Sequence, residues 1–439
     1  MNKKYFIETY GCQMNKSDSE LMQLSMDSEG FTEAADKNEA DIIIYNTCSV
    51  RKNAEDRAYS NIRESKAHMR RKNGIVVASG CMAQRIGQKF IDDKIADLVI
   101  GPYTSPRIGQ IVKNYIKGGR QQLFISQEKD KFTERLNPGL ISSKDSTPWH
   151  KWITITHGCE NFCTYCIVPY VRGPLISFSS GHILDFIKKS AMSGVMEITL
   201  LGQNVNQYGQ DNKDIPFYEL LDRASLINGI EKINFLTSHP KDFDHRIVDV
   251  ISSRGNIADS IHLPLQSGSD SILQAMNRKY SVEHYLKIIE KIKSTLESYF
   301  ISTDIIVGFP GETEKDFLET LNVIKQVGYD EIFTYAYSPR LGTTASGLEN
   351  QVPEETKKER LSELIKAHRE AAHAKLKTFV GNQQRIIIER VSKKDDNKVM
   401  GRTFLNHPAV MDGNINDIGR IYNIKITELK GATFIAEKI

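Results

Sequence analysis

The sequence predicts an α/β protein with three parts: an open parallel sheet, a partial (β/α)6 barrel and a small antiparallel β-barrel. Two blocks, residues 1–120 and 149–375, alternate short apolar runs with helical periodicity, which is typical of parallel sheets. A polar stretch without sustained periodicity, residues 121–148, separates them and predicts a linker. The last segment, residues 376–439, changes to short β-rich runs. A chain of 439 residues is long enough for several domains.

The first block is expected to form a parallel sheet covered by helices. Its candidate strands are the apolar runs Tyr5–Glu8, Ile42–Tyr45, Ile75–Ala78 and Leu98–Ile100. Intervening segments such as Ser17–Ser28 and Asn53–Arg71 carry helical periodicity. Because strands and helices alternate, we expect the strands to pair in parallel.

The second block contains six strand–helix units. Its candidate strands are Trp152–Thr156, Glu197–Leu201, Lys232–Leu236, Ser260–Leu265, Phe300–Val307 and Glu331–Tyr337. Its candidate helices are His182–Met192, Phe217–Ala224, Asp244–Ser253, Ser281–Ser294 and Glu314–Val327. Six units cannot close an eight-stranded barrel, so we expect an open partial barrel with a side for a large substrate.

The final segment predicts a small antiparallel barrel. Its β-rich runs are Arg385–Val391, Lys398–Thr403, Arg420–Leu429 and Thr433–Ala436. Residues 378–439 carry 10 Lys and Arg against 7 Asp and Glu, a modest positive excess. This excess is compatible with phosphate contacts on RNA, and surface lysines on a solvated barrel would give the same count.

Six cysteines fall into two sets of three. The compact set, Cys159, Cys163 and Cys166, forms a CxxxCxxC loop after the first strand of the second block. Three thiolates can hold a [4Fe–4S] cluster and leave its fourth iron open, and this spacing is typical of enzymes that bind S-adenosylmethionine (SAM) at that iron. The alternative is structural zinc, which needs four ligands, and no fourth cysteine lies nearby. His157, two residues before Cys159, is the substitute ligand that this alternative would require.

The spread set consists of Cys12, Cys48 and Cys81. Each follows directly on a candidate strand of the first block, after FIETYG, IIIYNT and IVVASG. The carboxyl ends of parallel strands share one edge of a sheet, where open α/β folds bind their ligands. We therefore expect a second three-thiolate cluster there. The alternative is three buried apolar cysteines without a ligand.

Polar turns at the carboxyl ends of the second block are the candidates for holding SAM. The expected contacts are Tyr165 in the cysteine loop, Gly202, Gln203 and Asn204, Ser238, and Gln266 and Ser267. Glycines permit close approach of the backbone, and amides and hydroxyls can bond to an amino acid, ribose or adenine. Asp304 lies within a candidate strand and is either a ligand contact or a core residue satisfied by hydrogen bonds.

The cysteine content and the lack of any long apolar run predict a cytoplasmic protein without a membrane partner. The chain begins MNKKYFIETYG, without an apolar signal segment, and no run approaches the ~20 apolar residues that span a bilayer. Thiols stay reduced in the cytoplasm, which suits two metal sites better than disulfides. The net charge of +3 is too small to identify a partner.

Along nearly its whole length the chain resembles the radical-SAM methylthiotransferase family. The resemblance rests on ETYGCQMNKSDSE, YNTCSVRKNAEDR, SGCMAQR, GCENFCTYCIVPYVRG and LLGQNVNQYG, and extends to TSHPKD, HLPLQSGSD and TDIIVGFPGET. The GCQMN form around Cys12 resembles the branch that modifies tRNA rather than the branch that modifies a ribosomal protein. The C-terminal segment resembles a TRAM domain, a small RNA-binding barrel.

The resemblance implies a function and its cofactors. Cys12, Cys48 and Cys81 would hold an auxiliary [4Fe–4S] cluster that donates sulfur, and the compact set would hold the cluster that cleaves SAM to a radical. The reaction would place a methylthio group on C2 of an N6-isopentenyl adenine beside the tRNA anticodon, with a second SAM supplying the methyl group. The implied partners are a tRNA anticodon stem-loop, an electron donor such as flavodoxin or ferredoxin, and a sulfur or Fe–S carrier.

The chain departs from the family pattern beside the cysteine loop. Where the family continues RG-x-E-x-S-R, this chain reads RGPLISF over residues 172–178 and lacks the acid and the second arginine. Gly181 stands where an acid is common, and Leu341 and Thr344 stand where prolines are expected. Three other functions are the alternatives to methylthiolation of N6-isopentenyladenosine in tRNA. The chain could be a methylthiotransferase acting on a ribosomal protein, one acting on threonylcarbamoyladenosine, or a non-catalytic Fe–S protein that binds RNA.

Overall fold

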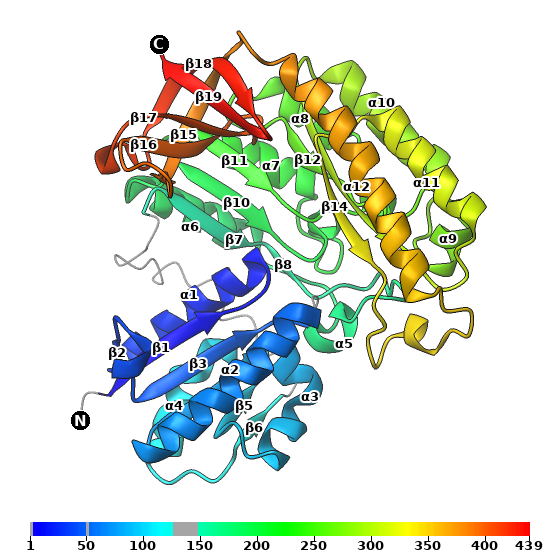
Figure 1. Cartoon of the computed structure of the whole chain (residues 1–439). Helices are drawn as coiled ribbons and strands as arrows, with labels where there is room; N and C mark the ends of the chain where they lie inside the picture. The colour runs from blue at the N-terminus through cyan, green and yellow to red at the C-terminus, as the bar shows by residue number, and fades with distance from the viewer. Residues whose placement is uncertain (1–2, 50–51, 126–147) are drawn as a thin grey trace.

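The computed structural model describes residues 3–49, 52–125 and 148–439 and confirms the predicted α/β class (Figure 1). An N-terminal parallel sheet, a central set of parallel strands and a closed C-terminal barrel follow one another along the chain. The linker predicted at residues 121–148 lies largely outside the described residues. Leu123–Phe124 (β6), within that predicted linker, instead adds the last strand to the N-terminal sheet.

The N-terminal sheet has six parallel strands in the order β2-β1-β3-β4-β5-β6. Its remaining strands are β1 (Lys4–Thr9), β2 (Thr32–Glu33), β3 (Ile42–Thr47), β4 (Ile75–Gly80) and β5 (Leu98–Ile100). The helices are α1 (Gln13–Ser28), α2 (Lys52–Arg71), α3 (Cys81–Asp92) and α4 (Ile108–Ile116). Two apolar clusters pack α1 and α4 on one face and α2 and α3 on the other. The edge strands β2 and β6 escape sequence reasoning because two residues carry no periodicity.

The central part contains the six predicted parallel strands. They are β7 (His150–Thr154), β10 (Glu197–Leu201), β11 (Lys232–Phe235), β12 (Ser260–His262), β13 (Phe300–Val307) and β14 (Glu331–Ala336). Hydrogen bonds divide them into two three-stranded sheets, which a bridge between Ile233 and Ile257 joins. The strands therefore follow one another in chain order around an open arc, as expected for a partial barrel.

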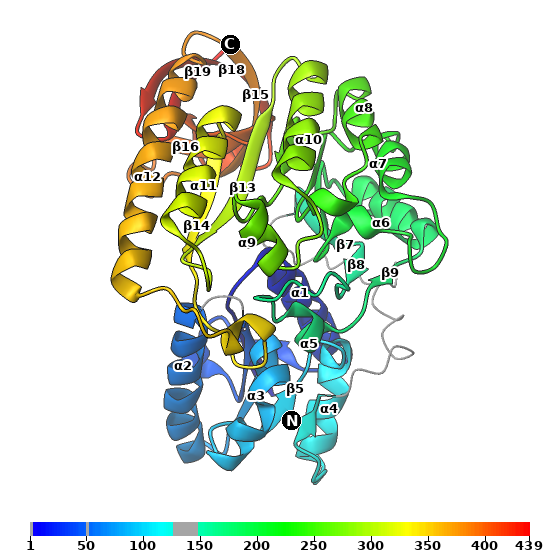
Figure 2. The ribbon, with the colours of Figure 1, turned by 90° about the vertical axis from the view of Figure 1, so that its right-hand side faces the viewer.

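Helices cover the outside of this arc, as Figure 2 shows. They are α6 (Ser180–Met192), α7 (Phe217–Ser225), α8 (Arg246–Ser253), α10 (Val282–Thr295), α11 (Glu314–Val327) and α12 (Glu354–Lys377). Short elements lie at the ends of the strands: β8 (Thr156–His157), α5 (Val168–Arg172), β9 (Ile176–Ser177), α9 (Asp270–Ala275) and the 3-10 helices η6 (Val205–Gln207), η7 (Pro240–Asp242) and η8 (Thr344–Gly347). Three further 3-10 helices are η1 (Lys37–Glu39), η2 (Ser105–Arg107) and η9 (Ile415–Asp417).

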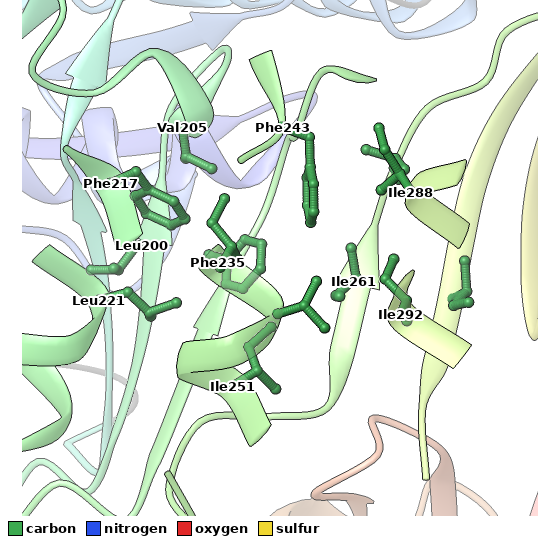
Figure 3. Packing of buried hydrophobic residues seen from close by; sticks show 14 of the residues in the cluster. Leu200, Val205, Phe217, Leu221, Phe235, Phe243, Ile251, Ile261, Ile288 and Ile292 are labelled. Carbon is green, nitrogen blue, oxygen red and sulfur yellow. The ribbon is translucent and has the colours of Figure 1, made fainter. Parts of the chain in front are cut away.

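The core of the central part forms between strands and helices (Figure 3). Leu200 and Phe235 point from the strands toward Phe217 and Leu221 of α7, and the rings of Phe217 and Phe235 meet at 5.3 Å. All four side chains are almost wholly buried. Burial of such side chains is the main favourable contribution to folding, and it holds the strand ends in fixed positions.

The C-terminal segment forms a closed five-stranded barrel in the order β15-β16-β17-β19-β18. Its strands are β15 (Gln383–Val391), β16 (Lys398–Thr403), β17 (Pro408–Asp412), β18 (Ile421–Lys430) and β19 (Thr433–Lys438). β17 was not predicted, because it starts with proline and is short. The barrel docks on the amino-terminal ends of the central strands: Lys232 Nζ, at the start of β11, donates to the Thr403 carbonyl at 3.2 Å.

Among the described residues, no helix combines the length and apolarity required to cross a membrane.

The first residue of β7 makes stability dependent on pH. His150 is buried, with Nε2 2.9 Å from Thr199 Oγ1. Burial lowers the pKa of His150 to about 4; nearby Lys232 and Lys16 also lower it, and Glu197 opposes them. Between about pH 6.5 and pH 4 the unfolded chain therefore binds a proton that the folded chain excludes, so stability falls as the pH falls.

We predict that His150 costs the apoprotein about 2 kcal/mol of unfolding free energy between pH 7 and pH 5. Urea unfolding followed by tryptophan fluorescence measures this, because Trp149 and Trp152 flank His150. His150→Gln should show a correspondingly smaller difference between the two pH values. His182→Gln, at an exposed position of α6, should behave as the parent. An unchanged pH dependence in His150→Gln would contradict the assignment.

Candidate functional site

The carboxyl edge of the N-terminal sheet brings the spread cysteines together. Thr47 and Gly80 are paired across β3 and β4, so Cys48 and Cys81 leave the sheet from adjacent positions. Cys12 caps the start of α1 just beyond β1. The preceding Gly11 lies against Cys48 so closely that a Cβ there would come within 2.7 Å of Cys48 Sγ. The parallel register thus places the three cysteines at one edge, as predicted.

Asn15 of α1 ties these strand ends to one another. Its Nδ2 donates to the Tyr10 carbonyl at 2.7 Å and to the Thr47 carbonyl at 3.0 Å. Its Oδ1 lies 3.9 Å from Cys12 Sγ. Asn15 is completely buried, so these bonds are shielded from water and hold the first two cysteine-bearing turns together.

The compact cysteines lie in a loop that is held by backbone hydrogen bonds to two segments of the central part. Thr164, between Cys163 and Cys166, receives the backbone N–H of Ala345 at 2.8 Å and donates its own N–H to the Met276 carbonyl at 3.1 Å. Burial raises the pKa of Cys159 to about 11, and the neighbouring Cys163 adds to the rise. Burial likewise raises the pKa of Cys166, with Cys163 and then Cys159 contributing. Three thiols grouped in one loop fit a shared metal cluster, which would remove their protons.

Each cysteine set is contacted by one buried arginine. Arg278 Nη1 lies 3.5 Å from Cys163 Sγ, and Arg278 Nη2 donates to the Pro264 carbonyl at 2.9 Å. Arg172 Nε donates to Cys81 Sγ at 3.3 Å. Burial alone would lower the pKa of Arg172, but Cys81, Cys12 and Cys48 together raise it.

Helix α5 links the compact cysteines to the position of Cys81 in the spread set. This helix starts two residues after Cys166, and Ile167 and Val171 pack against Cys81 in one apolar cluster. Figures 1 and 2 both place α5 beside α3, between the N-terminal sheet and the central strands. The short helix α5 is thus the element that separates the compact cysteine loop from Cys81.

Polar side chains connect the cysteine loop to the ends of β10 and β11. Asn161 Oδ1, in the loop, accepts from Lys241 Nζ at 2.5 Å and lies 3.5 Å from Gln207 Nε2. Asn204 Nδ2, after β10, donates to Asp242 Oδ2 at 2.7 Å. Of these residues only Asn204 was predicted. Gln207 lies in the quoted GQNVNQ turn, Lys241 and Asp242 lie in the SHPKD turn, and Asn161 lies in the cysteine loop; these motifs were the signal available to find them.

Several polar atoms in these turns lack a partner among the described residues. They are Gln203 Oε1, Asn206 Nδ2, Gln207 Oε1, Ser238 Oγ and His239 Nε2. Buried polar groups in folded proteins are almost always hydrogen-bonded, so a cluster of unpaired ones at a strand mouth fits a polar ligand. Gln203 and Ser238 are among the predicted SAM contacts. The residues present therefore fit SAM.

Five further residues predicted to contact SAM have neighbours within the protein. Gly202 packs on Thr156, where a Cβ would lie 2.1 Å from Oγ1. Gln266 has a positive φ of 71° and pairs by its backbone with β13. Ser267 Oγ lies 3.4 Å from Thr320 Oγ1, and Asp304 Oδ2 lies 3.4 Å from His262 Nε2. Tyr165 packs beside α9 in a small apolar cluster. Contact of these five residues with SAM stays a prediction.

Two of the departures from the family pattern are buried and two are exposed. Leu175 and Phe178 are buried, and Phe178 belongs to the central apolar cluster. The backbone N–H of Ser177 donates to Asp211 Oδ2 at 3.1 Å. Gly181 and Leu341 are exposed. In the segment where the family pattern has charged side chains, this chain thus has buried apolar side chains and a backbone hydrogen bond to Asp211.

Within the three described ranges, no three His, Cys, Asp or Glu side chains are arranged to hold a single metal ion.

Comparisons with known proteins agree with this geometry. Residues 4–101 match the uncharacterized protein family UPF0004, and residues 153–324 match the radical SAM superfamily. The chain is 41% identical over 441 residues to the tRNA-2-methylthio-N(6)-dimethylallyladenosine synthase of Clostridium botulinum, covering 99% of this chain and 97% of that protein. The synthase of the same name from Natranaerobius thermophilus is 40% identical, with 97% and 94% covered. The chain belongs to this family of tRNA-modifying synthases.

It is therefore a radical SAM enzyme, and its superfamily binds a [4Fe–4S] cluster and SAM. Among solved structures, the radical SAM methyltransferase TsrM from Kitasatospora setae is similar with a TM-score of 0.58 and 10% identity. That likeness covers 78% of this chain and 75% of TsrM and concerns the fold alone.

We predict that Gly158→Ala abolishes metal binding by the compact cysteines. Gly158 has a φ of +76°, and a Cβ there would lie 1.9 Å from the Pro174 carbonyl oxygen. Removing the clash must move Cys159, whose N–H bonds to the Gly173 carbonyl at 3.1 Å. A positive φ adds strain of order 1–3 kcal/mol.

Iron content and visible absorbance after anaerobic reconstitution measure the effect in a C12A/C48A/C81A background, where only the compact set remains. Gly181→Ala is the matched control, since only Ser179 Oγ, at 3.7 Å, lies near its Cβ position. Full iron uptake by Gly158→Ala would show that the loop tolerates the displacement.

Proposed function

We propose that this chain transfers a methylthio group to C2 of N6-isopentenyladenosine next to the tRNA anticodon. The observation that carries the proposal is the packing of Cys81, from the spread set, against Ile167 and Val171, which follow directly after the CxxxCxxC loop. The printed names of the relatives supply the substrate. Activation of carbon in one place and supply of sulfur in another requires two sites that face a common substrate.

The chain supplies ligands and positioning for this chemistry. Cys159, Cys163 and Cys166 would hold one [4Fe–4S] cluster, and Cys12, Cys48 and Cys81 would hold the second. When bound, the first cluster with SAM supplies the radical that removes hydrogen from C2, and the second supplies sulfur. The unpaired polar atoms of Gln203 and Ser238 would orient SAM at the mouth of the strands. Cys48, Cys81 and Cys163 are buried, which would limit the access of water to part of each site.

The substrate adenine has to leave the anticodon loop to reach this position, as bases generally do in enzymes that act on their ring atoms. The C-terminal barrel docks on the opposite ends of the central strands, where it would contact tRNA away from the reacting base. An electron donor such as flavodoxin or ferredoxin and a sulfur or Fe–S carrier would complete the cycle. Six free thiols favour the reducing cytoplasm as the location.

The proposal is tested with anaerobically reconstituted protein, SAM, a reductant and tRNA bearing N6-isopentenyladenosine. Mass analysis of the nucleosides should detect 2-methylthio-N6-isopentenyladenosine. Modification of a ribosomal protein or of threonylcarbamoyladenosine in its place would assign the chain to one of those substrates. Two intact clusters without any 5′-deoxyadenosine release would leave a non-catalytic RNA-binding protein.

We predict that the two cysteine sets separate by function. Replacing Cys12, Cys48 and Cys81 by alanine should leave 5′-deoxyadenosine formation detectable and remove the methylthio product, because only sulfur supply is lost. Replacing Cys159 by alanine should remove both products. Chromatography of the small molecules and nucleosides from one reaction measures both. Loss of both products in the first variant, with its remaining cluster intact by spectroscopy, would contradict this division.

A further inference from the structure

Arg172 makes three polar contacts that cross between two parts of the molecule. Its Nε donates to Cys81 Sγ at 3.3 Å, and its Nη2 donates to Asp18 Oδ2 at 2.6 Å and to Asn15 Oδ1 at 3.1 Å. Arg172 is the last residue of α5, whereas its three partners belong to the N-terminal part. The Arg172 carbonyl also accepts from Tyr103 Oη at 3.1 Å. Both the side chain and the backbone carbonyl of Arg172 thus form hydrogen bonds with the N-terminal part.

The guanidinium and its carboxylate partner are both buried. The Arg172 and Asp18 side chains are 3% and 1% exposed. Arg172 Nη1 is buried and has no partner among the described residues. Nε therefore bonds to a thiol and Nη2 to a carboxylate and an amide oxygen, whereas Nη1 has no acceptor among the described residues.

Such a contact alters the electronic state of a metal-bound thiolate. Hydrogen bonds to the sulfurs and nearby positive charge stabilise the reduced, more negative form of an iron–sulfur cluster and raise its reduction potential. The low dielectric of a buried site strengthens the effect. Asp18 opposes it, because its carboxylate neutralises part of the guanidinium charge at 2.6 Å.

We infer that Arg172 is a positioning residue that fixes Cys81 against the radical-generating loop and raises the reduction potential of the auxiliary cluster, with Asp18 setting the size of the rise. This inference rests on the proposed function, since it requires a cluster on Cys12, Cys48 and Cys81. It adds to that function a residue that lies on the same short segment as the compact cysteines. A single side chain would thereby connect the sulfur-donating site to the site of radical formation.

The test uses the full chain with Cys159, Cys163 and Cys166 replaced by alanine, so that only the auxiliary cluster is present. A redox titration followed by electron paramagnetic resonance gives its midpoint potential. Arg172→Gln should lower the midpoint potential by at least about 59 mV, which for one electron corresponds to a tenfold change in the equilibrium constant of reduction. Arg172→Lys, which keeps the charge but loses the planar fork, should lower it less. Asp18→Asn should raise the midpoint, because the arginine charge is then uncompensated.

Arg246→Gln is the matched control. Arg246 pairs with Asp244 at 2.6 Å on the exposed surface, so its replacement should leave the midpoint unchanged. Opposite shifts in Arg172→Gln and Asp18→Asn support the inference, since a merely structural contact has no reason to give opposite signs. Unmoved midpoints, or shifts in the same direction, overturn it. If Arg172→Gln fails to take up iron, Arg172→Lys and Asp18→Asn decide the question by the same signs. A parent chain that takes up no cluster refutes the auxiliary site itself and thus the proposed function.

Discussion

The buried ion pair between Arg172 and Asp18 is the constraint on which the relation of the two cysteine sets depends. Burying both charges costs several kcal/mol per ion unless each is paired and hydrogen-bonded. Here the carboxylate receives Nη2 at 2.6 Å, and Asn15 Oδ1 accepts from the same nitrogen. Such a pair does not tolerate a small displacement, because a separated charge would remain buried. It therefore favours one relative placement of α1 and α5 over neighbouring placements.

Further contacts reinforce that placement. Ser17 Oγ lies 3.1 Å from Thr154 Oγ1 at the end of β7, and Thr154 Oγ1 lies 3.4 Å from Met14 Sδ. Both contacts are buried and join α1 to the first central strand. The N-terminal sheet thus meets the central strands along α1 and α5, with the cysteines of both parts at the junction. Chemistry at the carboxyl ends of parallel strands is general, and here two such edges are turned toward each other.

The segment after the cysteine loop shows how sequence change beside a site can be absorbed. Leu175 and Phe178 stand where the family pattern has an acid and an arginine, and both are buried. Two aspartates of the loop that follows η6 satisfy the backbone here: Asp211 accepts from Ser177 N–H, and Asp214 accepts from Ser180 N–H at 2.7 Å. In this chain, apolar packing takes the positions where the pattern has charged residues. Arg172, six residues after Cys166, keeps its contacts with the N-terminal part despite these changes.

The sequence by itself determined the α/β class, the ten longer strands of the first two parts and the placement of each cysteine after a strand, because apolar periodicity and chain order report these directly. It also determined the family through its motifs. It did not reveal β2 or β6, which are too short to show a period, or β17, which begins with Pro408. Only the tertiary structure decided that Arg172 reaches Cys81 and that Asn161 joins Lys241. Such contacts link residues 80 or more positions apart. They depend on how packed strands and helices bring distant turns together, and local pattern carries no record of that arrangement.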